Sequence, residues 1–201
     1  MDWASIIAEE AKTSTIFRSD SLAKKYRIPL PSTLVALKRQ EKRGLVKRIG
    51  QKVYINNLAA GFNIRDLASA IRPESYISLD SALHEWGISS QSPVALTCIG
   101  LKQNSQIKAD SVQIEFHTIK KSLFGGFQSK KTRYNTYQIA EPEKALLDWI
   151  YLRRKENLPI DLDEFQLQLI SRSKLVTYAQ KYPTSTLNSL YPVLAERQFS
   201  A

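Results

Sequence analysis

The feature that most constrains the fold is the segment 31–55, where a helical pattern of side chains passes directly into an alternating one. Residues 31–43 (PSTLVALKRQEKR) repeat at helical spacing. Gly44 follows them, as glycine does where the backbone turns left-handed at the end of a helix. Residues 45–49 and 52–55 then alternate as two strands around a short turn. The segment therefore predicts a helix that leads straight into a β-hairpin.

The predicted helix has two different faces. Leu34, Leu37 and Glu41 fall on one side at 100° per residue, and we expect this side to pack on a small core. The opposite side is small or cationic, and we expect it to face a partner: Ser32, Val35, Ala36, Arg39 and Arg43.

The residues before this segment complete a recognisable order of elements. Helical spacing predicts a helix over 2–12, and Ser19 is a suitable N-cap for a short helix over 20–26. Residues 16–18 predict a short strand that pairs with the hairpin, and Pro31 suits the start of the basic helix. Helix, short helix, turn, basic helix and hairpin is the order of a winged helix-turn-helix. We therefore predict a winged helix-turn-helix DNA-binding domain over residues 1–58.

Charge is concentrated in the same region. The chain of 201 residues has a net charge of +10 and a pI near 9.7, which predicts a polyanionic partner, either nucleic acid or an anionic membrane surface. Residues 1–58 hold 12 Lys and Arg against 5 Asp and Glu, so they carry +7 and the other residues +3. Because the excess coincides with the basic helix, we expect double-stranded DNA.

Residues 59–201 predict a second domain that combines helices with a small sheet, so the fold class is α+β. The expected strands are 94–99, 112–119 and 132–139. The expected helices are 63–71, 79–86 (capped by Ser78), 142–155, 161–171, 173–182 and 184–198. The helix that begins at Pro142 is the most hydrophobic, and we expect it to lie at the centre of this domain.

Two blocks of the second domain resemble a known family. Residues 76–88 (YISLDSALHEWGI) and 140–148 (AEPEKALLD), with Tyr151, Leu152 and Arg153 after them, resemble the signature blocks of AbiEi antitoxins of abortive-infection (type IV) toxin–antitoxin systems. The resemblance implies a winged domain that binds inverted repeats in its own promoter and represses the operon. It also implies a C-terminal antitoxin domain that neutralises a nucleotidyltransferase-like toxin. Gln40 departs from the leucine common in such helices, and the turn Gly50-Gln51-Lys52 departs from the frequent Gly-Arg-Gly.

Side-chain chemistry predicts how the basic helix and hairpin would meet DNA. Ser32, Val35 and Ala36 are short enough to approach base edges, and Arg39 suits a bidentate contact with guanine. The remaining cations are expected to contact phosphates, which set position and affinity: Lys38, Lys42, Arg43, Lys47, Arg48 and Lys52. The alternative is a solvated basic face without a partner.

A second candidate surface surrounds the apolar loop 123–127. A basic rim around exposed apolar side chains is typical of an interaction surface, and we predict contact with the toxin or its RNA target. Its residues are Lys120, Lys121, Leu123, Phe124, Phe127, Lys130, Lys131 and Arg133. The alternative is that the three apolar side chains fold back into the core.

Catalytic and metal-binding patterns are weak. His84 and His117 have no second ligand at metal spacing, and one cysteine, Cys98, excludes an internal disulfide. Asp110 and Glu115 resemble a nuclease-like acidic pair, but the completing lysine is missing. Glu143, Lys144 and Asp148 fit a helix network better than a catalytic set. We expect no catalysis, no metal and no cofactor.

The remaining expectations concern location and class. We expect a cytoplasmic protein without a membrane partner, because no apolar run approaches the ~20 residues that span a bilayer. The first alternative function is a winged-helix repressor whose C-terminal domain senses a ligand or dimerises. The second is an enzyme that processes nucleic acid.

Overall fold

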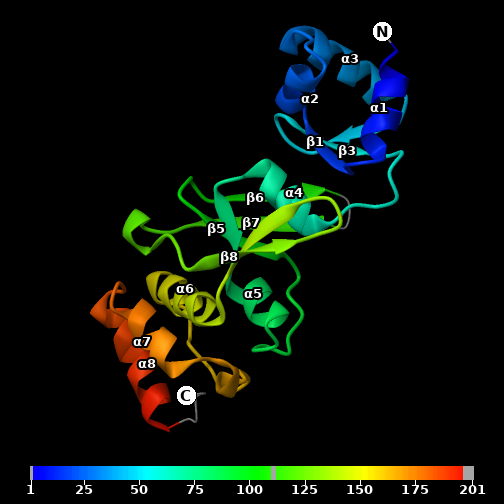
Figure 1. Cartoon of the computed structure of the whole chain (residues 1–201). Helices are drawn as coiled ribbons and strands as arrows, with labels where there is room; N and C mark the ends of the chain where they lie inside the picture. The colour runs from blue at the N-terminus through cyan, green and yellow to red at the C-terminus, as the bar shows by residue number, and fades with distance from the viewer. Residues whose placement is uncertain (1, 110–111, 197–201) are drawn as a thin grey trace. The chain divides into compact units, whose positions relative to one another are not determined.

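The computed structural model describes residues 2–109 and 112–196 (Figure 1). Within these residues the chain is of mixed helix and strand, with eight α-helices and two sheets. It divides into two compact units, of which the first is Met1–Pro73 with Lys131–Tyr137 and the second is Glu74–Lys130 with Gln138–Ala201. The domain boundary that we place after residue 58 stays a prediction.

The first unit begins with three helices and a three-stranded antiparallel sheet, as the sequence predicts. Its elements are α1 (Trp3–Ala11), β1 (Ile16–Arg18), α2 (Ser19–Lys25), α3 (Leu30–Lys42), β2 (Val46–Arg48) and β3 (Val53–Asn56). The predicted pairing of residues 16–18 with the hairpin is confirmed, because β3 lies between β1 and β2 and Phe17 is opposite Tyr54. The two rings stack 5.7 Å apart.

A small apolar core joins these helices to the sheet. It contains Ile6, Ile7, Phe17, Leu22, Leu37, Val46 and Tyr54, with Trp3 packed against it. Gly44 ends α3 with a φ of +74°, which confirms its predicted role at the helix end. Ser19 does not cap α2 through its side chain: it is the first helical residue, and Arg18 occupies the cap position. Helix α4 (Ile64–Ile71) completes the unit, with the Asn63 side chain accepting a hydrogen bond from the Arg65 amide.

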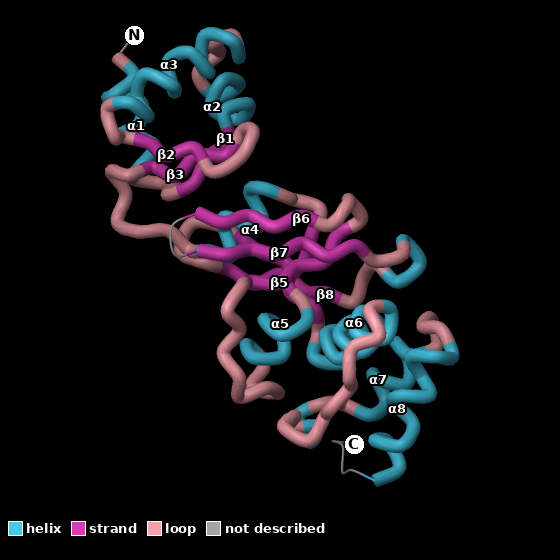
Figure 2. Tube along the Cα trace, turned by 180° about the vertical axis from the view of Figure 1, so that it is seen from behind, coloured by secondary structure: helices cyan, strands magenta, loops and turns pink. Residues whose placement is uncertain are grey.

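The second unit is built on a six-stranded mixed sheet in the order β6-β7-β5-β4-β9-β8 (Figure 2). The strands are β4 (Ser75–Ile77), β5 (Leu96–Gly100), β6 (Ser105–Ala109), β7 (Val112–Thr118), β8 (Phe127–Lys131) and β9 (Thr136–Ala140). β4 pairs antiparallel with β5 and parallel with β9. The sheet has three strands that the sequence does not predict, namely β4, β6 and β8.

The helices of this unit form a stack that begins on the sheet. α5 (Leu79–Glu85) packs on β5, α6 (Pro142–Lys155) packs on α5, and both α7 (Arg172–Ala179) and α8 (Thr184–Glu196) pack on α6 (Figure 1). The central position of α6 is confirmed, since ten of its consecutive residues, 143–152, are buried. The helix expected over 161–171 is wrong: the segment forms turns and a short 3₁₀ helix at Leu167–Leu169.

Candidate nucleic-acid interface

Helix α3 is rotated about its axis relative to the sequence prediction. Its buried residues are Thr33, Ala36, Leu37 and Gln40, so the expectation that Ala36 faces outward is wrong. Leu34 is 37% exposed and Glu41 is exposed, so of the three residues expected to face the core only Leu37 does. Small side chains fit where α3 approaches α1, and Thr33 donates to the Pro29 carbonyl at 3.2 Å. Two leucines were too few to fix the phase of the helix.

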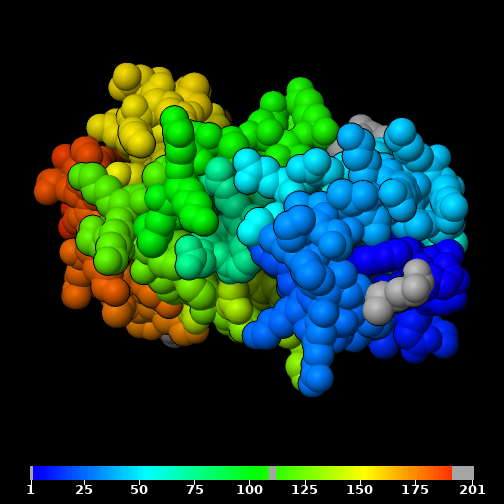
Figure 3. Space-filling model, turned by 90° about the horizontal axis from the view of Figure 1, so that it is seen from above, coloured from blue at the N-terminus to red at the C-terminus, as the bar shows by residue number. Residues whose placement is uncertain are grey.

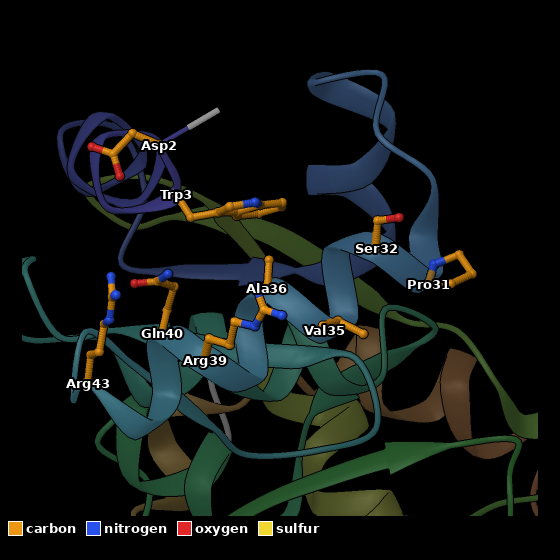
Figure 4. Close-up of a pocket in the computed structure, with 9 residues that line it drawn as sticks. All are labelled: Asp2, Trp3, Pro31, Ser32, Val35, Ala36, Arg39, Gln40 and Arg43. Carbon is orange, nitrogen blue, oxygen red and sulfur yellow. The ribbon is translucent and has the colours of Figure 1, made fainter.

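The outer side of α3 forms the floor of a hollow rather than a convex ridge. The N-terminus of α1 supplies the opposite wall through Asp2 and Trp3 (Figure 4). The hollow has a volume of about 550 Å³ and is otherwise lined by Pro31, Ser32, Val35, Ala36, Arg39, Gln40 and Arg43. Figure 3 views the same end of the first unit, with the dark blue atoms of α1 beside the lighter blue of the following segments. The hollow thus contains five residues for which we predict DNA contacts.

Four cations of α3 stand in solvent. Lys38, Arg39, Lys42 and Arg43 are exposed, and among the described residues none of them forms an ion pair. Their charge is therefore available to an external anion. Ser32 and Val35, the latter 55% exposed, lie on the same helix and are also accessible.

The cations of the hairpin are already engaged in part. The Arg48 guanidinium donates to the carbonyls of Gly50 at 2.9 Å and Gln51 at 3.1 Å, so it braces the turn between β2 and β3. Lys52 lies 3.4 Å from the Asp20 carboxylate, and Lys47 is half-buried. We therefore expect the hairpin cations to contribute less to anion binding than the four on α3.

Asp20 ties the hairpin to the beginning of α2. Arg18 donates two hydrogen bonds to its carboxylate, at 3.1 and 2.9 Å. These bonds from Arg18, with further help from Lys52, hold the pKa of Asp20 down at about 2. The carboxylate is thus ionised over the whole range in which DNA binding is measured.

The scan against protein-family models finds no match to this chain, and the search of curated proteins finds no similar sequence. The AbiEi resemblance therefore rests on the residues of the two blocks alone. None of the described helices combines the length and the apolar character needed to cross a membrane.

The second block lies at the centre of a buried polar network. Lys144 and Asp148 are 2% and 0% exposed and form a direct ion pair within α6. Tyr76 and Ser78 each donate to Asp148 at 3.0 Å, and Tyr182 donates to it at 2.6 Å. Burial raises the pKa of Asp148 and lowers the pKa of Lys144, because both charged forms lose water. The predicted pairing of Lys144 with Asp148 within the helix is confirmed, but the pair lies inside the unit rather than on its surface. Glu143 is not part of it, because its carboxylate accepts a hydrogen bond from the Ser171 amide at 2.9 Å.

This network also explains an incorrect capping prediction. Ser78 precedes α5 as expected, but its hydroxyl makes no capping hydrogen bond. It donates to Asp148 instead. The sequence offers no signal for this choice, since the two residues are 70 positions apart.

The apolar loop of the second unit folds inward, so the alternative interpretation is confirmed. Leu123 is 4% exposed, and the rings of Phe124 and Phe127 pack on Tyr76 with centroids 5.3 and 4.8 Å away. Lys130 pairs with Glu85 at 3.0 Å, and its ammonium lies 3.7 Å from the centre of the Trp86 ring.

The remaining cations of this predicted surface are exposed. Lys120 and Lys121 are exposed on the second unit. Lys131 and Arg133 are exposed as well, but they belong to the first unit. The predicted surface around an exposed apolar loop is therefore wrong, and a role of the individual lysines stays a prediction.

The weak catalytic candidates are held by neighbouring side chains. Glu115 accepts hydrogen bonds from Gln106 at 2.8 Å and Gln113 at 2.7 Å, and it lies 3.7 Å from His117. Asp110 lies outside the described residues. The His84 ring nitrogen Nδ1 is 3.3 Å from the Ser89 carbonyl. Within residues 2–109 and 112–196 no group of His, Cys, Asp and Glu is arranged to hold a metal ion.

Proposed function

We propose that the chain is an antitoxin and autoregulatory transcriptional repressor of a type IV toxin–antitoxin operon. Its first unit acts as a winged helix-turn-helix that binds operator DNA through α3 and the hairpin β2–β3. Its second unit counteracts a nucleotidyltransferase-like toxin.

The DNA-binding part depends on one observation: Lys38, Arg39, Lys42 and Arg43 on α3 are exposed and form no ion pair with any residue that the structure describes. Cations that are not engaged by the protein can replace the counterions of DNA phosphates, and the released counterions favour binding. The order of helices, and the pairing of β1 with the hairpin, support the winged arrangement. The net charge of +7 over residues 1–58 supports the same partner.

The antitoxin part rests on the resemblance of residues 76–88 and 140–148 to the AbiEi blocks. Both blocks lie in the second unit, where Tyr76 and Ser78 of the first block donate hydrogen bonds to Asp148 of the second. The two blocks therefore belong to one folded core. The toxin is a functional partner, and the proposal does not require a stable complex with it.

Two experiments test the two parts separately. Fluorescence anisotropy with the duplex upstream of its own gene should show binding that weakens steeply between 50 and 200 mM salt. A well-folded protein without such binding would refute the repressor. Induction of the neighbouring gene should stop growth, and co-expression of this chain should restore it. Binding to DNA without restored growth would leave a winged-helix repressor with a ligand-sensing or dimerisation module.

A further inference from the structure

The hollow beside α3 contains a polar group that the folded chain leaves unsatisfied. Gln40 is 5% exposed, and its side-chain oxygen Oε1 is buried without a hydrogen-bond partner among the described residues. A buried acceptor without a partner costs about 1–3 kcal/mol relative to a paired one. Leucine has nearly the same size and would avoid this cost. The free fold therefore gives no reason for an amide at this position.

Gln40 lines the hollow, while its Oε1 atom is itself buried, so the amide has to rotate for this atom to meet a group in the hollow. Gln40 lies one turn after Ala36 and almost one turn before Arg43, and all three line the same hollow. Figure 4 shows its side chain rising from α3 toward the wall formed by Asp2 and Trp3. The group that satisfies Gln40 must therefore enter between α1 and α3.

The surroundings favour nucleic acid as the source of that group. Arg39 and Arg43 line the same hollow, and both are exposed. The volume of about 550 Å³ lies within the range of roughly 300–1,000 Å³ that small-molecule sites span, so the edge of one base fits. In the major groove, adenine N6 and cytosine N4 are the amino groups that donate hydrogen bonds. A carbonyl oxygen in the hollow would accept from either.

We propose that Gln40 is a specificity-determining residue of the DNA interface, which accepts a hydrogen bond from the exocyclic amine of a base that enters the hollow. Adenine is the preferred base, because the glutamine amide also offers an N–H group to adenine N7. This inference rests on the proposed DNA-binding function. It adds to that interface a residue that charge and exposure alone do not select.

The test begins with the sequence preference of the full-length protein. Duplexes selected by the wild-type chain from a randomised library are compared with those selected by Gln40→Leu. Loss of a preference for adenine or cytosine at one position is expected in Gln40→Leu, together with a loss of roughly 5–150-fold in the ratio of selected to random duplex affinity. The thermal midpoint of Gln40→Leu should equal or exceed that of the wild type, because an unsatisfied amide is removed.

A matched control separates base recognition from charge. Lys38→Gln removes a neighbouring cation on the exposed side of α3, and it should weaken binding to selected and random duplexes equally. Identical selected sequences and an unchanged affinity ratio for Gln40→Leu would overturn the inference while leaving the DNA-binding proposal intact. Failure of the wild-type chain to bind or enrich any duplex would overturn both.

A base analogue in the DNA tests the same contact with the wild-type protein, so the result does not depend on the folding of a variant. Replacing the selected adenine by purine, which lacks the N6 amine, should weaken wild-type binding by a similar factor. With Gln40→Met, which is flexible and apolar, the same replacement should have no effect, so the two losses are not additive. Equal losses for wild type and Gln40→Met would show that another residue contacts the amine.

Discussion

Arg39 and Lys38 are adjacent on α3, yet the structure gives them different expected roles. Arg39 lines the hollow beside Ala36 and Gln40, whereas Lys38 does not. We predict that Arg39→Ala costs about 1–3 kcal/mol of binding free energy on the selected duplex and relaxes specificity at one guanine. Competition binding against random duplex measures both effects. A variant with the wild-type affinity ratio would contradict the assigned role.

Asp20 makes the folding stability of the first unit depend on pH in the acidic range. Its pKa is about 2 in the folded chain against an ordinary value of 3.8, so its contribution to stability is fully present above pH 4. The contribution is lost as the pH falls from about 4 to 2. We predict that Asp20→Asn lowers the urea midpoint at pH 5 but that the two proteins converge near pH 2. An equal difference at both pH values would show that the Asn change acts through something other than this charge.

The residue types predicted the chemistry of the side chains better than they predicted which side of α3 faces the core. The exposed cations and the glycine at the end of α3 follow directly from the sequence. The phase of α3 did not, because Thr33, Ala36 and Gln40 are buried by the shape of the neighbouring helix rather than by their own hydrophobicity. Asp2 and Trp3 were missed as parts of the site, since they lie almost thirty residues before the helix that they face. The signal that the sequence did offer for the orientation of α3 was spacing: Thr33 and Gln40 lie four residues before and three residues after Leu37, on the same side of the helix.

Substitutions at two glycines, Gly44 and Gly126, can distinguish the cost of backbone strain from the cost of a steric contact. Both have positive φ, +74° for Gly44 and +70° for Gly126. A Cβ on Gly44 would meet nothing within 4 Å, but one on Gly126 would lie 2.9 Å from the Tyr178 ring and 3.1 Å from Lys144 Cγ. We predict that Gly44→Ala costs about 1–2 kcal/mol from strain alone. Gly126→Ala should cost about 1–3 kcal/mol more, because the buried ion pair must shift.

Chemical unfolding of both glycine variants provides the measurement. Equal losses of unfolding free energy would mean that the loop before β8 shifts without disturbing Lys144. A larger loss in Gly126→Ala would place the tight contact where this loop meets Lys144 of α6 and Tyr178 of α7. Gly44→Ala serves as the matched control, since it changes backbone strain without adding a contact.

At the level of elements, the sequence predicted helices with strong apolar faces and strands with clean alternation. The alternation over 112–119 is confirmed by the burial of Ile114 and Phe116 in β7. β4 was missed because it is short and its partners lie elsewhere in the chain. β6 pairs with the next strand, β7, but it was missed because Ile107 is its only large apolar residue. β8 was missed because its first residue, Phe127, is assigned from the sequence to the apolar loop 123–127 and its other residues to no element. Local pattern does not encode pairing between strands such as β4 and β9, which are about sixty residues apart.

For the whole molecule, the unequal distribution of charge predicts which lysines control salt dependence. If about six phosphates are neutralised, log K against log salt should have a slope near −5. Lys42→Gln should reduce that slope by about 1, because the lysine is exposed on α3 and carries no ion pair within the described part of the chain. Lys102 and Lys108 are exposed on the second unit, and their replacement by Gln should leave the slope unchanged.

The same measurement tests the charge argument as a whole. Equal reductions from Lys42→Gln and Lys102→Gln would mean that net charge, rather than the face of α3, determines affinity. Titrations in at least four salt concentrations distinguish these outcomes, because the slope and not a single affinity is compared.

The path of the chain has a consequence for biosynthesis. The backbone leaves the first unit after Pro73 and returns to it over Lys131–Tyr137, where Thr132 donates to the buried Asp66 at 2.8 Å. A nascent chain therefore lacks part of its first unit until residue 137 has been synthesised. A chain that stops before residue 131 would lack parts of both units. A chain that stops after residue 137 would contain all of the first unit but only part of the second, so the first unit is the earlier of the two to be completed.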